Sequence, residues 1–203
     1  MLFIQHELQR TAQNLVTDNI KNGEHVLVVS SSDQSKELID AIVTAASSTG
    51  AASVSAIIIA CPENLRDYKH PPAVIASVES ADLTIVATSL RFPRAYDDLS
   101  EALFKAGKRQ VLINNAPLED FTRGASLADP IKLNRRTHAL AAKISKGKIV
   151  RVTSGNGTDL SVRVSRPCIA LTGRAELDTG FGSFPSGEAM LSPEERTAEG
   201  TFV

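Results

Sequence analysis

Residues 25 to 30 read His-Val-Leu-Val-Val-Ser, a short apolar run rich in β-branched residues that decides the fold of this chain. Three more runs of the same kind follow at residues 53 to 60, 83 to 88 and 110 to 114. Such runs are typical of strands that are buried on both faces of a sheet. The segments between them carry apolar residues at helical spacing, such as Leu38, Ile39, Ile42, Val43 and Ala46. The alternation predicts βαβ units, and therefore an α/β fold with a Rossmann-like parallel sheet and flanking helices.

Two helices are predicted outside this alternation. One runs from about Leu8 to Ile20 and stops at Asn22-Gly23, because glycine readily ends a helix. The other runs from about Asp129 to Lys146 and starts with Asp129-Pro130, a capping residue followed by proline at the first helical position.

After Gly147 the sequence pattern changes from buried strands to half-exposed strands. Residues 149 to 153 and 159 to 165 alternate apolar and polar side chains around Ser-Gly-Asn-Gly-Thr, which predicts an antiparallel hairpin. We therefore predict a Rossmann-like domain at residues 1–147 and the start of a second, antiparallel β-containing domain at residues 148–203. Residues 166–203 are rich in Gly, Ser and Pro, so by themselves they bury too little apolar surface to offset the cost of ordering them.

The composition is that of a soluble globular protein with almost no net charge. Lys and Arg total 22 against 23 Asp and Glu, a formal net charge of −1, so neither nucleic acid nor a membrane surface is expected as a partner. No run approaches the roughly 18 apolar residues of a membrane helix, and no secretory pattern is present. Cys61 and Cys168 fit neither a CxxC pair nor a disulfide framework, so we expect a cytoplasmic, reduced protein.

Polar loops follow three of the predicted strands, at the sheet edge where ligands bind in open α/β folds. The loop after the first strand could hold an anion or a substrate carboxylate at a helix start, but the favoured interpretation is that Ser32 or Asp33 caps the helix. The other two contain residues that ordinary turns require. Without a GxGxxG or P-loop motif, no dinucleotide cofactor is predicted. The three loops are Ser30-Ser31-Ser32-Asp33, Arg91-Phe92-Pro93-Arg94 and Asn114-Asn115-Ala116-Pro117.

The four histidines do not form a metal-ligand pattern. His6, His25, His70 and His138 are isolated from one another and no HExxH motif occurs, so we expect them at the surface or in packing. Neither cysteine has a candidate base nearby in the sequence. No catalytic residue is therefore predicted from these side chains.

Among the carboxylates, Glu188 is the strongest candidate for a functional residue. It lies in Phe184-Pro185-Ser186-Gly187-Glu188, and the turn and the apolar residues that follow predict a strand that draws the carboxylate partly inside. A half-buried carboxylate is costly unless it meets a cation or hydrogen-bond donors. The competing interpretation is a solvated loop glutamate.

Three motifs stand out in residues 147 to 203: Gly157-Thr158-Asp159-Leu160, Gly173-Arg174 and Phe184-Pro185-Ser186-Gly187-Glu188. With these motifs the segment resembles the junction region of the aminopeptidase T family of metallo-aminopeptidases. The resemblance implies that the second domain is metal-binding, that Glu188 is a ligand of a two-metal site for Zn, Co, Mn or Mg ions, and that the substrate is a peptide. It also implies a homodimer that pairs through the later region. The other ligands are expected beyond Val203, so the catalytic residues stay unknown and the catalytic site is expected to be incomplete in this chain. Three motifs in the earlier part of the chain also match the family: Pro71-Pro72, Ala81-Asp82-Leu83 and Val111-Leu112-Ile113.

A related fold over the same span is that of ring-cleaving dihydroxypyridine dioxygenases, which use one non-haem iron. We do not expect Glu188 to be one of their iron ligands. The first hypothesis is therefore a metal-dependent aminopeptidase-like protein that releases amino-terminal residues from peptides. The alternatives are a non-catalytic α/β binding or assembly module, and a dioxygenase relative that takes Fe and a small-molecule substrate.

Overall fold

The computed structural model describes residues 2–61, 68–88, 98–113, 117–176 and 180–203 of the chain. The chain forms two compact units, each built from two segments of the sequence. The first, called the α/β unit, comprises Met1–Pro130 and Thr172–Ser186. The second, called the β-rich unit, comprises Ile131–Leu171 and Gly187–Val203.

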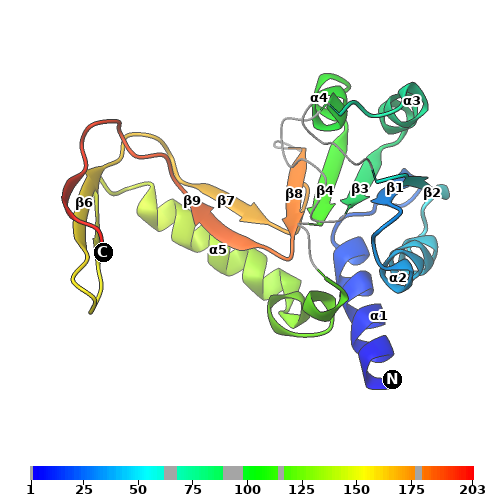
Figure 1. The fold of residues 1–203 in the computed structure, drawn as a ribbon, viewed down its shortest axis with the longest axis horizontal. Coiled ribbons are helices and arrows are strands. Elements are labelled where there is room, and N and C mark those ends of the chain that lie inside the picture. The colour runs from blue at the N-terminus through cyan, green and yellow to red at the C-terminus, as the bar shows by residue number, and fades with distance from the viewer. Residues whose placement is uncertain (1, 62–67, 89–97, 114–116, 177–179) are drawn as a thin grey trace. The chain divides into compact units, whose positions relative to one another are not determined.

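A five-stranded parallel sheet forms the centre of the α/β unit (Figure 1). All neighbouring strands are parallel, and Val28, for example, lies opposite Ala56 on one side and Ile85 on the other. The structure thus confirms the predicted α/β fold with a parallel sheet. The strands are β1 (His25–Ser31), β2 (Ser53–Ile59), β3 (Leu83–Ala87), β4 (Arg109–Ile113) and β8 (Phe181–Phe184), in the order β2-β1-β3-β4-β8.

Four helices flank this sheet and divide its apolar residues between two cores. They are α1 (Leu2–Thr17), α2 (Lys36–Ser47), α3 (Pro72–Ser80) and α4 (Asp98–Lys105). Side chains alternate across a strand, so Val26 and Val28 of β1 pack with α1 and α2, whereas Leu27 and Val29 pack with α3 and α4. The two helix pairs therefore cover opposite faces of the sheet, as in a doubly wound fold. Phe104, near the end of α4, lies outside these cores, because its side chain is 83% exposed.

Two short 3-10 helices, η1 (Leu118–Phe121) and η2 (Gly124–Leu127), follow β4 in the chain. Phe121 is fully buried, and its ring lies 6.1 Å from that of Phe184 in β8. Arg10 of α1 donates to the carbonyl of Leu127 at 3.1 Å. The segment after β4 is therefore held against both the last strand and the first helix of the unit.

The β-rich unit contains α5 (Pro130–Ile144) and two small sheets. The predicted hairpin is confirmed, because Ile149 lies opposite Arg163 in an antiparallel pair of strands. The predicted helix start at Asp129-Pro130 agrees with the first residue of α5. One sheet has the order β10-β6-β5 and the other joins β7 to β9; the strands are β5 (Ile149–Thr153), β6 (Asp159–Arg163), β7 (Ile169–Thr172), β9 (Gly187–Met190) and β10 (Glu199–Thr201).

Candidate functional site at the carboxyl edge of the parallel sheet

The strand order places a topological switch point at β1. From β1 the chain passes through α2 to β2 on one side, and from β2 it returns through α3, on the other face, to β3 on the opposite side of β1. In open α/β sheets, ligands bind outside the carboxyl ends of the strands at such a point. The groups that end β1, β2 and β3 are therefore the first candidates for a binding site.

The serines at the end of β1 join the ends of neighbouring strands. Ser30 is buried, and its Oγ donates to the carbonyl of Ala87 at the end of β3, at a distance of 2.7 Å. Ser32 Oγ accepts the backbone N–H of Cys61, which follows β2, at 3.0 Å. Both hydroxyls bond to the backbone of neighbouring segments. The two serines therefore hold the ends of β1, β2 and β3 together.

The helix cap after β1 is Ser35, which corrects the prediction that Ser32 or Asp33 takes this role. Ser35 Oγ accepts the backbone N–H of Leu38 at 3.3 Å, in the first turn of α2. The physical reason is that β1 continues to Ser31, so the chain needs a turn before it can enter the helix.

The two other polar loops predicted at this edge lie almost wholly outside the described residues. These are residues 91–94 and 114–116. Pro117 is described, and its carbonyl accepts the N–H of Asp120 in the first turn of η1. A ligand role for these loops stays a prediction.

A buried histidine pairs with a partly exposed aspartate between the starts of α3 and α4. His70 comes shortly before α3, and Asp98 is the first residue of α4. The side chain of His70 is 3% exposed, and its Nδ1 lies 2.7 Å from Asp98 Oδ1. The backbone N–H of His70 donates to Asp98 Oδ2 at 2.9 Å, and the Tyr68 ring meets the His70 ring edge-on at 5.1 Å. The pair therefore ties the chain that enters α3 to the start of α4.

Burial and the hydrogen bonds from His70 act in opposite directions on the pKa of Asp98. Burial acts to raise the pKa of Asp98, but the hydrogen bonds from His70 outweigh burial and hold that pKa below its usual 3.8. An ionised carboxylate only accepts hydrogen bonds, so Asp98 is the acceptor in both hydrogen bonds that join it to His70. Burial, and then the nearby Asp98 and Cys61, raise the pKa of Tyr68.

Sequence reasoning placed His70 in packing or at the surface and did not single out Asp98. The structure supports packing, because the His70 side chain is buried. The two residues are 28 positions apart and belong to no motif, so no signal in the sequence joins them. Their pairing depends on the order of the strands.

Glu188, the predicted metal ligand, lies in β9 with its side chain exposed. The expectation that it is half-buried is wrong, because β9 belongs to a two-stranded sheet that leaves most of this strand open to solvent. Within the described residues, no group of three or more His, Cys, Asp or Glu side chains could hold a metal ion. The described residues therefore do not fit a metal by themselves, and the role of Glu188 as a ligand stays a prediction.

The other histidines and the cysteines occupy positions expected of isolated residues. His6 and His138 are exposed, and His25 Nδ1 lies 2.8 Å from the hydroxyl of Ser53. Neither Cys61 nor Cys168 forms a disulfide bond. No helix in the described part of the chain is long and apolar enough to span a membrane.

Comparison with known proteins finds a matching family model and solved structures of similar fold. The family model for 2,5-dihydroxypyridine 5,6-dioxygenase (NicX) matches residues 7–203. Among solved structures, wild-type AmpT from Thermus thermophilus is similar with a TM-score of 0.59 at 15% identity, over 96% of this chain and 63% of that chain. An alanine–glyoxylate aminotransferase from Nostoc sp. is similar over 64% of this chain and 38% of that chain, with 14% identity and a TM-score of 0.36. No curated protein sequence matches the chain.

The family match and the structural similarity support different conclusions. At 15% identity the likeness to the Thermus thermophilus protein concerns the fold alone, so the resemblance to aminopeptidase T is confirmed as a structural relationship only. This chain spans 63% of the length of that protein. The family match, by contrast, extends over segments of both units. The chain belongs to the 2,5-dihydroxypyridine 5,6-dioxygenase family.

Proposed function

We propose that this chain is part of a ring-cleaving dioxygenase that opens a hydroxylated pyridine-type ring with a non-haem iron. The observation that carries the proposal is the family match over residues 7–203. The proposal gives the protein a small aromatic substrate and molecular oxygen as the second substrate. The proposal favours the dioxygenase alternative over the aminopeptidase of the first hypothesis.

The proposal assigns metal binding to the later part of the chain. We propose that residues 148–171 and 187–203, which belong to the β-rich unit, begin the metal-binding domain, whereas β8 belongs to the parallel sheet. The described residues hold no group of three or more side chains that could bind a metal, so the iron must take ligands from outside them. We therefore assign no ligand and no chemical step to the iron.

The role that we propose for His70 and Asp98 is to position the helices at the sheet edge. The His70 side chain is 3% exposed, so a substrate reaches it poorly. Its two hydrogen bonds to Asp98 join the starts of α3 and α4, which lie at the edge where ligands of such sheets bind. A substrate loop built on these helices would depend on this pair for its position.

The direct test is oxygen consumption by the protein as its gene encodes it. After loading with Fe(II) under anaerobic conditions, the protein is given 2,5-dihydroxypyridine and oxygen in an electrode chamber. We expect substrate-dependent uptake of oxygen that a chelator abolishes. Absence of uptake in a preparation shown to contain iron would contradict the proposal.

An aminopeptidase is the second candidate function. It is favoured by the likeness of fold to AmpT and by the Phe184-Pro185-Ser186-Gly187-Glu188 motif, in which Glu188 would bind a divalent metal. The same preparation, loaded in turn with Zn, Co, Mn or Mg ions, is assayed for release of the amino-terminal residue from a short peptide. Peptide cleavage without oxygen uptake would support this candidate, and neither activity would support a non-catalytic module.

A further inference from the structure

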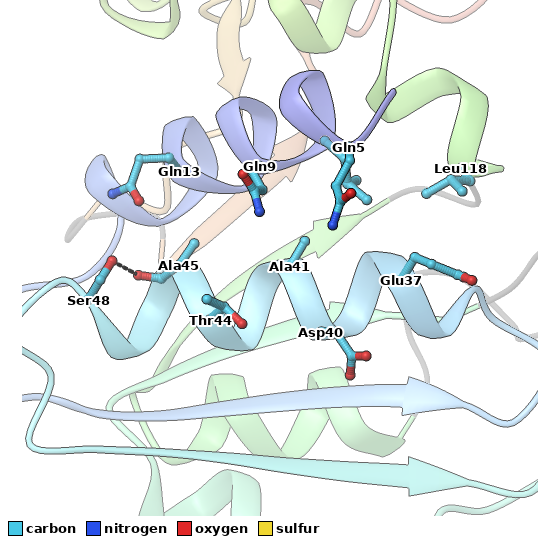
Figure 2. Close-up of a pocket in the computed structure, with 11 residues that line it drawn as sticks. Gln5, Gln9, Gln13, Glu37, Asp40, Ala41, Thr44, Ala45, Ser48 and Leu118 are labelled. Atoms are coloured by element: carbon cyan, nitrogen blue, oxygen red, sulfur yellow. Dashed lines mark hydrogen bonds between the residues drawn. The ribbon is translucent and has the colours of Figure 1, made fainter. Parts of the chain in front are cut away.

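A groove lies between α1 and α2 of the α/β unit (Figure 2). Its volume is about 880 Å³. Sites for small ligands typically measure about 300–1,000 Å³. All residues that line the groove belong to the α/β unit, and none of them is a residue of the candidate site described above. The groove is therefore a second place on this unit where a ligand could bind.

The floor of the groove is apolar and built from short side chains. Ala41 and Ala45 lie four residues apart on α2, and Figure 2 shows that both point toward α1. Leu8 of α1 is buried at the base, and Leu118 of η1 lies at one end. Because the alanine side chains are short, another chain has room to lie between the two helices.

Three glutamines form the wall on α1. Gln5, Gln9 and Gln13 are spaced four residues apart, so they follow one another along the helix at intervals of about 6 Å. Figure 2 shows the side chains of Gln5 and Gln9 extending toward α2. Gln13 Nε2 donates to the hydroxyl of Thr17 at 3.0 Å, whereas within the described residues the side-chain amides of Gln5 and Gln9 make no hydrogen bond. These two amides can each donate to and accept from a ligand.

The facing wall, on α2, is acidic near the end where Leu118 lies. Glu37 and Asp40 line the groove there, and no Lys or Arg among the described residues lines it. Hydrogen bonds from its own backbone N–H and from Ser35 hold the pKa of Glu37 below its usual 4.5, so its carboxylate is charged at neutral pH. Asp40 pairs with Lys36 at 2.5 Å, but both side chains are largely exposed, and exposed pairs are weak. This end of the groove therefore favours a positively charged group.

We propose that this groove binds a polypeptide segment in extended conformation, with a Lys or Arg side chain of that segment beside Glu37 and Asp40. An extended chain presents backbone N–H and C=O groups along one edge at a repeat of about 6.7 Å, which is two residues. That repeat is close to the interval of about 6 Å between glutamines on one face of a helix. Gln5 and Gln9 can thus bond to backbone groups one repeat apart, and main-chain bonds of this kind give peptide recognition its affinity.

Other ligands match the walls of the groove less well. A helix uses its backbone groups internally, so it offers the glutamine amides no main-chain partner. A linear polyamine fits the carboxylates, but it has no acceptor for the amide N–H groups of Gln5 and Gln9. Glu37 and Asp40 would repel an anion or a nucleic acid. An extended peptide with one basic side chain complements both walls.

The test is a titration of the ¹⁵N-labelled protein followed by nuclear magnetic resonance. The probe is a pooled library of blocked hexapeptides that begin with Lys and carry only Val, Thr, Ser or Ala at the other positions; Val and Thr favour extended chains. A pool is suitable because the glutamines would contact the peptide backbone and not its side chains. We expect the side-chain amide signals of Gln5 and Gln9 to shift with peptide concentration, while that of the buried Gln110 in β4 stays in place.

Two variants and a second library test each wall separately. The variant Gln5→Ala, Gln9→Ala should weaken binding of the Lys library by at least about tenfold, as measured by the shifts of backbone amides along α2, because two hydrogen bonds are lost. A library that begins with Glu should bind wild type at least about tenfold more weakly than the Lys library. The variant Glu37→Gln, Asp40→Asn should lose this preference for Lys.

The matched control is Glu79→Gln, which removes an exposed carboxylate of α3 on the opposite face of the sheet and should bind like wild type. Circular dichroism establishes that every variant is folded. The proposal is overturned if the Lys library leaves the signals of Gln5 and Gln9 unmoved, if both libraries bind equally, or if the glutamine variant binds like wild type. It is also overturned if spermidine, or an Ala-rich helical peptide with one Lys, shifts these signals at lower concentration than the Lys library does.

Discussion

Asn19 and Gly173 lie 154 positions apart in the sequence, yet the Asn19 side chain donates a hydrogen bond to the Gly173 carbonyl at 2.8 Å. The same amide donates to the carbonyl of Leu15 at 2.8 Å and accepts the backbone N–H of Ala175 at 2.8 Å. Asn19 is 1% exposed, so water does not compete for these bonds. They fasten the segment that leads into β8 to the end of α1, and so bring a late strand into the sheet.

Replacing Asn19 should destabilise the α/β unit. Asn19→Ala leaves the buried N–H of Ala175 and the partly buried carbonyl of Gly173 without their partner, at a cost of about 1–3 kcal/mol for each such group. We expect the free energy of unfolding in urea to fall by about 2–4 kcal/mol. Gln9→Ala, an exposed change on α1, is the control and should stay within about 0.5 kcal/mol of wild type. Equal stability of the two variants would contradict this role of Asn19.

Gly182 in β8 should not tolerate a side chain. A Cβ atom there would lie 2.7 Å from the carbonyl carbon of Arg174 and 2.8 Å from the nitrogen of Ala175, and backbone atoms cannot move aside easily. We expect Gly182→Ala to cost about 1–3 kcal/mol in the free energy of unfolding, as overpacking typically does. Gly155→Ala meets nothing within 4 Å and should be close to neutral. A stable Gly182→Ala protein would show that β8 is not held against the Arg174 segment.

The pair of His70 and Asp98 predicts a pH-dependent stability. Because hydrogen bonds from His70 hold the pKa of Asp98 below 3.8, the ionised carboxylate stabilises the folded state. That contribution is fully present above pH 3.8 and is lost as the pH falls through the lowered pKa. Asp98→Asn should therefore lower the Tm at pH 7, and the gap to wild type should narrow below pH 3.8.

The control for this experiment is Asp40→Asn, which removes an exposed carboxylate paired with Lys36. Exposed pairs contribute little to stability, so its Tm should follow wild type across the pH range. If the difference in Tm between Asp98→Asn and wild type does not change with pH, the charge of the carboxylate does not contribute and the aspartate stabilises the fold through packing alone.

Glu188 separates the two candidate enzymes. In the proposed dioxygenase we do not expect it to bind iron, so Glu188→Gln should keep its iron content and its oxygen uptake. In an aminopeptidase the same change should lower metal occupancy and peptide cleavage by at least about tenfold, since a ligand is lost. Metal content is measured by atomic emission, with Glu79→Gln, an exposed carboxylate of α3, as the control. Loss of iron in Glu188→Gln would disprove the expectation that this residue is not an iron ligand.

The strands and helices of the α/β unit were largely readable from the sequence, because each depends on its own apolar pattern. The four predicted strands agree with β1 to β4 to within one residue at their starts. The fifth strand was not predicted. Its sequence, Phe-Gly-Ser-Phe, has no β-branched run, and it is stabilised by pairing with β4 and by the contacts of Gly182.

The candidate site was less accessible to sequence reasoning than the fold. Ser30 was singled out correctly as a residue at the sheet edge, but its partner, the carbonyl of Ala87, depends on which strand lies beside β1. The pairing of His70 with Asp98 likewise depends on two helices that meet only in the folded chain. Such contacts involve residues far apart in sequence, and local patterns carry no information about them.

The sequence by itself determined that this protein contains a parallel α/β sheet followed by an antiparallel hairpin, because periodicity of apolar residues is a local property. Only the tertiary structure decided the strand order, the entry of β8 beside β4, the burial of His70 against Asp98 and the exposure of Glu188. The physical reason is that these features arise from packing and hydrogen bonding between distant segments. Their energy is shared between residues, as it is between Asn19 and Gly173, and belongs to no single stretch of the chain.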